Sequence, residues 1–191
     1  MARIAIVGGI GSGKSAVTEI LRSFGARVIV ADEVNARLLN DPEYIELIKN
    51  RFPTAVHNNV INKKELAAIV YSDESKREEL MALAHPRIFK LMFDERDGWG
   101  EVVFYEIPLF TKTPFRFDEI WFVNASLAER IKRIVDRDGV STDRARRVIE
   151  LQKDESDLRQ KADIVIENDG DIESLGETVK VLYYSTLIRF A

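Results

Sequence analysis

Short apolar runs alternate with amphipathic segments along most of this chain. The runs are rich in β-branched and aromatic side chains, which is typical of buried strands, and they lie at 3–7, 27–30, 102–107, 119–123 and 163–167. Between them, apolar residues recur every three or four positions and predict helices at 14–24, 33–39, 42–51, 63–70, 74–93, 125–136 and 142–153, with a last helix ending near Ile188. Strands that alternate with helices predict an α/β fold, in which a parallel sheet is flanked by helices on both faces.

The stretch from Asp32 to Gly98 lacks runs of this kind and interrupts the succession of strands. We expect a purely helical insertion there, with Asp32 in the loop that precedes its first helix. Pro86 lies inside the helix expected over 74–93. Because proline has no amide hydrogen and clashes with the preceding turn, it should kink or restart that helix.

A cluster of glycines directly follows the first predicted strand. Gly8-Gly9-Ile10-Gly11-Ser12-Gly13-Lys14-Ser15 matches the phosphate-binding loop G-x-x-x-x-G-K-[ST], with a strand before it and a helix after it. The glycines let successive amide groups point inward around a polyphosphate, and the helix start adds the positive end of its dipole. We expect Lys14 to bridge the β- and γ-phosphates and Ser15 to offer its hydroxyl to Mg²⁺. A plain glycine-rich turn is the alternative, which the complete motif in this context disfavours.

Other nucleotide-site patterns fit poorly. Gly9 and Gly11 are followed by Lys14 where the dinucleotide fingerprint G-x-G-x-x-G needs a third glycine, which disfavours a hydride-transfer enzyme. A guanine-reading N-K-x-D motif is approached by Asn62-Lys63-Lys64-Glu65, which ends in glutamate and falls in the helical insertion. A GTP switch is therefore also disfavoured.

Two acidic residues stand at the ends of predicted strands. Glu106 closes the apolar run that begins at Val102, where a phosphate-loop enzyme places a carboxylate that orients Mg²⁺ or its waters. A solvated strand end is the alternative. Asp32 follows the run at 27–30, at the sheet edge where open α/β sheets bind ligands. An N-cap role for Asp32 fits the pattern equally well.

Basic residues accumulate between Arg130 and Lys161. Acidic residues are interspersed among them, which indicates a solvated helical face for most of them. Arg133 and Arg137 are four residues apart on one side of a helix, so they could reach a transferring phosphoryl group.

Composition and charge exclude several classes of protein. The 191 residues include no cysteine, so no disulfide framework, zinc ribbon, iron–sulfur cluster or cysteine nucleophile can form. The apolar runs are too short for a signal-peptide core or for the roughly 20 residues that cross a bilayer. The formal net charge is −4, which disfavours the overall basic surface that is typical of nucleic-acid-binding proteins. We expect a cytoplasmic protein that binds neither membrane nor nucleic acid, and a monomer, with an oligomer as the alternative.

An ordered set of motifs resembles the dephospho-coenzyme A kinase family over nearly the whole chain. The set begins with the phosphate loop and continues with Ala31-Asp32, His85-Pro86, Pro108-Leu109, Lys132-Arg133, Arg137-Asp138, Gln152 and Ala162-Asp163-x-Val165-Ile166-x-Asn168-x-Gly170. The phosphate loop alone would indicate only a superfamily, whereas the ordered set is much more specific.

The resemblance implies transfer of the γ-phosphoryl group of ATP, with Mg²⁺, to the ribose 3′-hydroxyl of dephospho-coenzyme A. The products are coenzyme A and ADP, and the reaction is the last step of coenzyme A biosynthesis. The resemblance also implies a nucleotide-binding core at 1–31, 99–136 and 162–191, a helical acceptor-binding insertion at 32–98 and a helical lid at 137–161.

The same resemblance assigns roles to individual residues. Asp32 is the implied general base, and Lys14 and Arg137 are the implied catalytic contacts to phosphate. Asp32, His85 and Pro108 are placed on the acceptor side, and Ser15 and Glu106 at the metal. The implied nucleotide contacts are Gly9, Ile10, Gly11, Ser12, Gly13, Lys14, Ser15, Ala16 and Asn168, the last beside the adenine.

The chain departs from the family pattern at several positions. Family members often carry Asp at Val30, Thr at Ala16, Asp at Glu106 and Arg at Val148. Lys112 stands near a position where they often carry Glu. None of these changes removes the phosphate loop or Asp32, so we expect an active kinase. Two alternatives stay open: a phosphate-loop kinase for another small molecule, such as a nucleoside or nucleotide, and a nucleotide-binding regulatory module without transfer chemistry.

Overall fold

The computed structural model describes residues 2–94, 102–107, 116–152 and 155–191. The chain divides into two compact units, of which the first combines Met1–Val30 with Arg96–Ala191 and the second is Ala31–Glu95.

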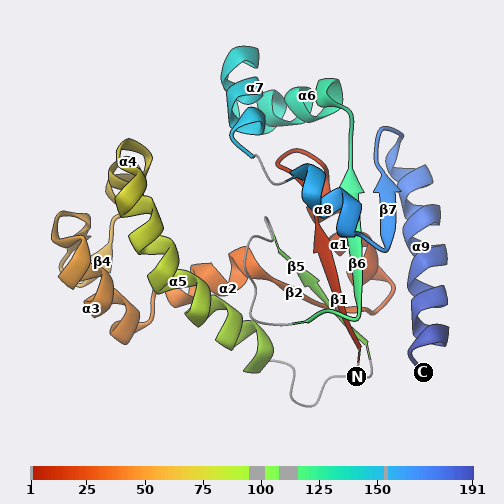
Figure 1. Cartoon of the computed structure of the whole chain (residues 1–191), viewed down its shortest axis with the longest axis horizontal. Coiled ribbons are helices and arrows are strands. Elements are labelled where there is room, and N and C mark those ends of the chain that lie inside the picture. The colour runs from red at the N-terminus through yellow and green to blue at the C-terminus, as the bar shows by residue number, and fades with distance from the viewer. Residues whose placement is uncertain (1, 95–101, 108–115, 153–154) are drawn as a thin grey trace. The chain divides into compact units, whose positions relative to one another are not determined.

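A parallel five-stranded sheet forms the centre of the first unit (Figure 1). Its strands are ordered β2-β5-β1-β6-β7, and every neighbouring pair is parallel. They are β1 (Ala2–Val7), β2 (Arg27–Val30), β5 (Val102–Glu106), β6 (Glu119–Asn124) and β7 (Ile164–Glu167). Each strand coincides with an apolar run of the sequence to within one residue at either end. The predicted α/β fold with a parallel sheet is therefore confirmed.

Two helices cover one face of this sheet. They are α1 (Lys14–Ser23) and α9 (Ile172–Arg189), which also contact each other. The core that they form with the strands includes Ile4, Ile6, Val17, Leu21, Phe104, Trp121, Val123, Leu175, Val179 and Tyr183. All residues of β5, which lies between β2 and β1 in the sheet, are buried.

The helices between β6 and β7 differ in detail from the predicted ones. α6 (Leu127–Asp138) begins after Ser126, whose side chain caps it, and ends at Gly139, which has a φ of 65°. α7 (Thr142–Glu150) packs on α6 through a small apolar cluster, and it ends earlier than predicted. The sequence pattern missed α8 (Glu155–Lys161), which contacts β6, because seven residues are too few to show a helical period.

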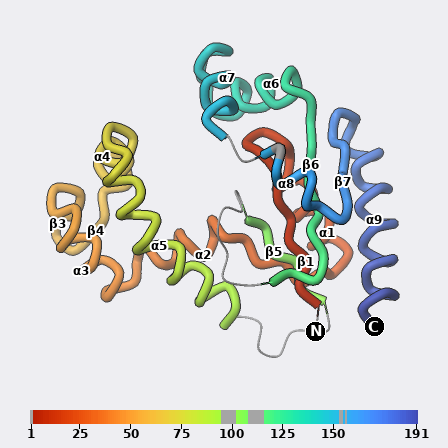
Figure 2. The backbone as a smooth tube through the Cα atoms, viewed as in Figure 1, coloured from red at the N-terminus to blue at the C-terminus, as the bar shows by residue number. Residues whose placement is uncertain are grey.

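The second unit is helical with one exception. Its helices are α2 (Ala31–Leu38), α3 (Pro42–Arg51), α4 (Lys63–Ser72) and α5 (Glu74–Asp94), with a 3₁₀ turn at Pro53–Ala55. The exception is an antiparallel hairpin of β3 (Val56–His57) and β4 (Val60–Ile61) (Figure 2). Asn58 and Asn59 form its turn with φ values of 51° and 60°, the left-handed pair that a tight hairpin turn requires. The expectation of a purely helical insertion is therefore wrong.

Two local expectations in this unit are also corrected. α2 begins at Ala31, immediately after β2, so Asp32 lies in the first turn of the helix and is neither a loop residue nor the N-cap. An acidic residue is favoured there by the helix dipole. α5 runs unbroken through Pro86, so the helix does not restart. Packing of α5 on α2 and α4 outweighs the hydrogen bond that is missing at Pro86.

Within the described part of the chain, no helix has the length and apolarity to cross a membrane.

A buried carboxylate ties α9 to the sheet. Glu119 in β6 is 3% exposed, and its Oε1 accepts hydrogen bonds from Trp121 Nε1 at 2.6 Å and from the Thr186 hydroxyl at 3.4 Å. Its other carboxylate oxygen pairs with Arg189. The last turns of α9 are therefore anchored by polar contacts as well as by apolar packing.

Replacing Glu119 with alanine is expected to lower the free energy of unfolding by about 2–4 kcal/mol, because a buried indole N–H loses its acceptor and Arg189 loses its partner. Urea unfolding followed by circular dichroism measures the change. Glu177→Ala is the control, since Glu177 is an exposed carboxylate on α9, and it should change stability by less than about 0.5 kcal/mol. An equally small effect of Glu119→Ala would show that the cluster does not anchor the helix.

Candidate active site

The glycine-rich loop joins β1 to α1, and two of its glycines are required by close neighbours. Gly13 immediately precedes α1 with a φ of 96°, and a side chain there would collide with the amide group of Asn168. Gly11 has a φ of 77°, and a Cβ at this position would lie 2.8 Å from the backbone oxygen of Arg130. Glycine is the residue that adopts such angles without strain and leaves room for such neighbours.

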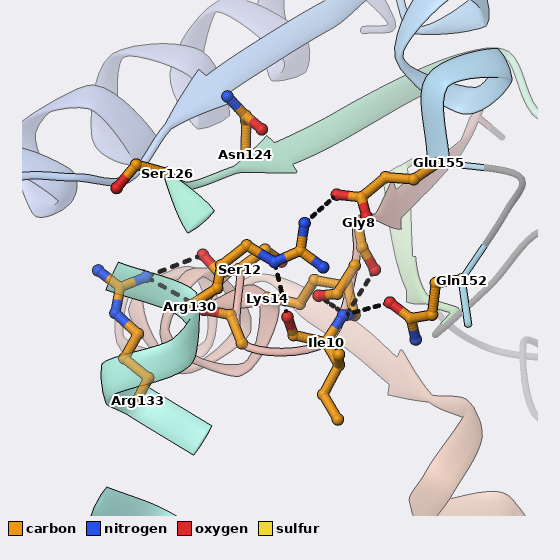
Figure 3. Close-up of polar contacts among 12 residues, drawn as sticks. Gly8, Ile10, Ser12, Lys14, Asn124, Ser126, Arg130, Arg133, Gln152 and Glu155 are labelled. Carbon is orange, nitrogen blue, oxygen red and sulfur yellow. Dashed lines mark hydrogen bonds and ion pairs between the residues drawn. The ribbon is translucent and has the colours of Figure 1, made fainter. Parts of the chain in front are cut away.

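Lys14 is the first residue of α1, and its side chain reaches back over the loop. Its Nζ donates hydrogen bonds to the backbone oxygen of Gly8 at 2.8 Å and of Gly9 at 3.2 Å (Figure 3). The first turn of α1 contains no acidic residue. A lysine ammonium and the positive end of a helix dipole therefore meet at the loop, an arrangement suited to binding an anion.

Arg133 and Asn168 hold the far end of the loop. Arg133 Nη1 donates to the backbone oxygens of Ser12 at 3.2 Å and Gly11 at 3.4 Å, and its Nη2 donates to the backbone oxygen of Asn168 at 2.7 Å. The Asn168 side chain is buried and donates from Nδ2 to the Ser12 backbone oxygen at 2.8 Å. The structure thus brings Asn168 to the loop from the end of β7.

The middle of the loop is held by residues to which the sequence analysis gave no role. Arg130 is 6% exposed, so a solvated helical face is the wrong interpretation for this residue. Its Nε donates to the Ile10 backbone oxygen at 2.8 Å, and its Nη1 pairs with Glu155 Oε1 at 2.6 Å. Gln152 Oε1 accepts the Ile10 N–H at 2.8 Å. Gln152 belongs to the ordered motif set, whereas no sequence signal distinguished Glu155 from its acidic neighbours.

Ser15 and Glu106 are linked through Thr18. The Thr18 hydroxyl lies 2.9 Å from the Ser15 backbone oxygen and 3.1 Å from Glu106 Oε2. Glu106 is 6% exposed, whereas Ser15 is exposed at the start of α1. Hydroxyl and carboxylate oxygens are the ligands that Mg²⁺ prefers, so these residues fit the predicted metal. The residues described include no cluster of three or more histidine or acidic side chains that could hold a metal by itself.

The remaining predicted site residues are not brought to the loop by any described contact. The Arg137 side chain is 62% exposed, and its guanidinium pairs with Asp138 at 2.7 Å, a hydrogen bond that raises the pKa of Arg137. Asp32 is exposed on α2. His85 on α5 is half-buried, its ring centroid is 6.2 Å from that of Phe89, and burial lowers its pKa. Pro108 lies outside the described residues.

Comparisons with known proteins place this chain in a family. The family model described as dephospho-CoA kinase matches residues 2–174. A dephospho-CoA kinase of Thermus thermophilus is 35% identical over 182 residues, which cover 94% of this chain and 89% of the relative. The crystal structure of TT1252 from Thermus thermophilus superposes with a TM-score of 0.83 at 34% identity, over 96% of this chain and 97% of the other.

A more distant likeness concerns the fold alone. Shikimate kinase from Bacteroides thetaiotaomicron has a TM-score of 0.54 at 17% identity, over 95% of this chain and 97% of that one. The family model matches residues 2–174, a range that includes the phosphate loop between β1 and α1. The chain belongs to the dephospho-CoA kinase family.

Proposed function

We propose that this protein transfers the γ-phosphoryl group of ATP to the ribose 3′-hydroxyl of dephospho-coenzyme A and releases coenzyme A and ADP. The observation that carries the proposal is the phosphate loop between β1 and α1 in a chain that matches the family from residue 2 to residue 174. The absence of cysteine fits a reducing compartment, and we infer a cytoplasmic location.

Lys14 and the loop amides have the main electrostatic role in this reaction. Phosphoryl transfer needs in-line positioning and stabilisation of charge on the transferred group more than it needs covalent chemistry. The Lys14 ammonium lies within 3.2 Å of two loop oxygens, which supports the proposal that it contacts phosphates bound by the loop. Arg137 is the second cation in the proposal, and it must exchange its pairing with Asp138 for a phosphate oxygen.

Ser15 and Glu106 are the proposed residues for Mg²⁺. The Ser15 hydroxyl would bind the ion, and the buried Glu106 carboxylate would orient it or its waters. When bound, Mg²⁺ neutralises charge on the phosphate oxygens.

Asp32 is the proposed general base, and His85 and Pro108 are proposed contacts to the acceptor. The Asp32 carboxylate is exposed in the first turn of α2 and can accept the proton of the attacking hydroxyl. The acceptor-binding role of residues 32–98 and the lid role of 137–161 belong to the same proposal. Closure of a lid would exclude water, which otherwise competes as the acceptor.

Mass spectrometry of a reaction that contains the protein, Mg·ATP and dephospho-coenzyme A tests this function directly. We expect coenzyme A to appear with ADP, and neither to appear when the protein is omitted. ADP formation that depends on a nucleoside or nucleotide acceptor, without coenzyme A, would instead indicate a different small-molecule kinase. Binding of ATP without acceptor-dependent ADP would indicate a regulatory module.

A further inference from the structure

Ile10, in the middle of the phosphate loop, is held at both of its backbone polar groups by side chains from distant parts of the chain. Its N–H donates to Gln152 Oε1 at 2.8 Å, and its C=O accepts from Arg130 Nε at 2.8 Å (Figure 3). Two side chains therefore fix the orientation of the peptide groups on either side of Ile10.

The contact from Arg130 completes a pattern along the loop. Lys14 contacts the oxygens of Gly8 and Gly9, Arg130 that of Ile10, and Arg133 those of Gly11 and Ser12. Five consecutive carbonyl groups are thus each within hydrogen-bond distance of a cationic side chain. In a trans peptide the C=O of one residue and the N–H of the next point in opposite directions. Because the Ile10 oxygen points toward Arg130, the N–H of Gly11 in the same peptide group points away from Arg130.

Glu155 determines where the Arg130 guanidinium lies. The side chains of Arg130 and Glu155 are only 8% and 19% exposed, and a guanidinium this buried requires a counter-charge. Arg130 Nη2 is buried without an acceptor, and the hydrogen bonds that the guanidinium makes with the described residues are those to Ile10 and Glu155. The pair also fills the space beside Gly9, where a Cβ would lie 2.6 and 2.7 Å from the Glu155 oxygens.

We propose that Arg130, oriented by Glu155, is a positioning residue of the phosphate loop that aims the N–H of Gly11 at the polyphosphate of the nucleotide. The inference rests on the proposed use of ATP. Arg130 acts through the loop backbone and does not touch the reacting atoms. Its loss should therefore weaken the binding of phosphate-bearing nucleotides more than it weakens the binding of the nucleoside.

The first test replaces Arg130 with methionine, which keeps an unbranched side chain but has no donor. Calorimetric titration with Mg·ATP should show a Kd about tenfold to a hundredfold higher, the usual range for a lost hydrogen bond to a charged group. The Kd for adenosine should change less than about twofold. Glu155→Gln keeps an acceptor but removes the charge, and its effect should have the same sign and a smaller size. This second variant keeps the proposal testable if Arg130→Met does not fold.

The double variant Arg130→Glu/Glu155→Arg separates positioning from stability. It restores an ion pair but places a carboxylate, which cannot donate, beside the Ile10 oxygen. We expect its melting temperature to recover relative to the single variants while its Kd for ATP stays high. Recovery of ATP affinity together with stability would overturn the proposal, and so would an unchanged ATP affinity in Arg130→Met.

Lys180→Gln is the control, because it removes one positive charge from an exposed ion pair on α9, with Glu177 at 3.7 Å. It should leave the Kd for ATP unchanged. Coenzyme A formation is measured on the same wild-type preparation. ATP binding without coenzyme A formation would contradict the proposed function. The effect of Arg130→Met on ATP affinity tests the positioning role of Arg130, whatever acceptor the enzyme uses.

Discussion

Replacing Lys14 with alanine is expected to lower kcat for coenzyme A formation by about 10²–10³-fold, the range found when one preorganised charge-stabilising group is removed. The ammonium lies 2.8 Å from the Gly8 oxygen and 3.2 Å from the Gly9 oxygen. These two hydrogen bonds hold the ammonium against the loop between β1 and α1. Because charge on the transferred phosphoryl group must be stabilised in the transition state, the loss should fall on kcat as well as on ATP affinity. An assay of ADP release at several ATP concentrations separates the two.

Lys180→Ala is the control for this variant. Lys180 is an exposed lysine of α9 that pairs with Glu177 at 3.7 Å, and its removal changes the net charge by the same amount. We expect its kcat to match that of the wild type. A Lys14→Ala protein that folds and keeps wild-type kcat would show that Lys14 does not stabilise the transferred phosphoryl group.

The second large effect is expected at Asp32. Replacing it with asparagine should lower kcat by about 10²–10⁴-fold, the usual contribution of a general base, because an amide cannot accept the proton of the attacking hydroxyl. ATP affinity should change little, since the proposed role of Asp32 concerns the acceptor. Steady-state rates with dephospho-coenzyme A and a direct titration with Mg·ATP measure the two quantities.

Glu33→Gln provides a close control for Asp32→Asn. Both acidic residues lie in the first turn of α2, so each neutralisation removes one charge from the same end of the helix dipole. Only Asp32→Asn should slow turnover. Equal rates for the two variants would remove Asp32 as the base and leave the rest of the proposed mechanism in place.

The sheet and the phosphate loop could be predicted because their signals are local. A strand buried on both faces, such as Val102–Glu106, must be apolar at nearly every position, so it stands out in the sequence. Gly11 and Gly13 of the loop have backbone angles that favour glycine, and a motif records such positions residue by residue. Short elements carry weaker signals, and for this reason the hairpin at Asn58 and the helix Glu155–Lys161 were missed.

The roles of the side chains that support the loop could not be predicted in the same way, although Gln152 and Asn168 stand in the ordered motif set. Arg130, Gln152 and Glu155 lie among many charged and polar residues, and nothing local separates a buried arginine from a solvated one. Arg130 is buried because α6 places it against Ile10, 120 positions earlier in the chain. The same limit applies to Asp32, for which a loop and an N-cap fitted the pattern, whereas the structure puts it inside α2.

The α/β class, the strand positions, the phosphate loop and the family could be inferred from the chain alone, because apolar periodicity and ordered motifs are local properties of a sequence. Which cations hold the loop carbonyls, and that Glu155 is the counter-charge of Arg130, became known from the folded arrangement. The physical reason is that burial changes the energetics of a charge. In water any arginine is stable unpaired, whereas inside the fold its partner must be close, and folding alone brings residues 10, 130 and 155 together.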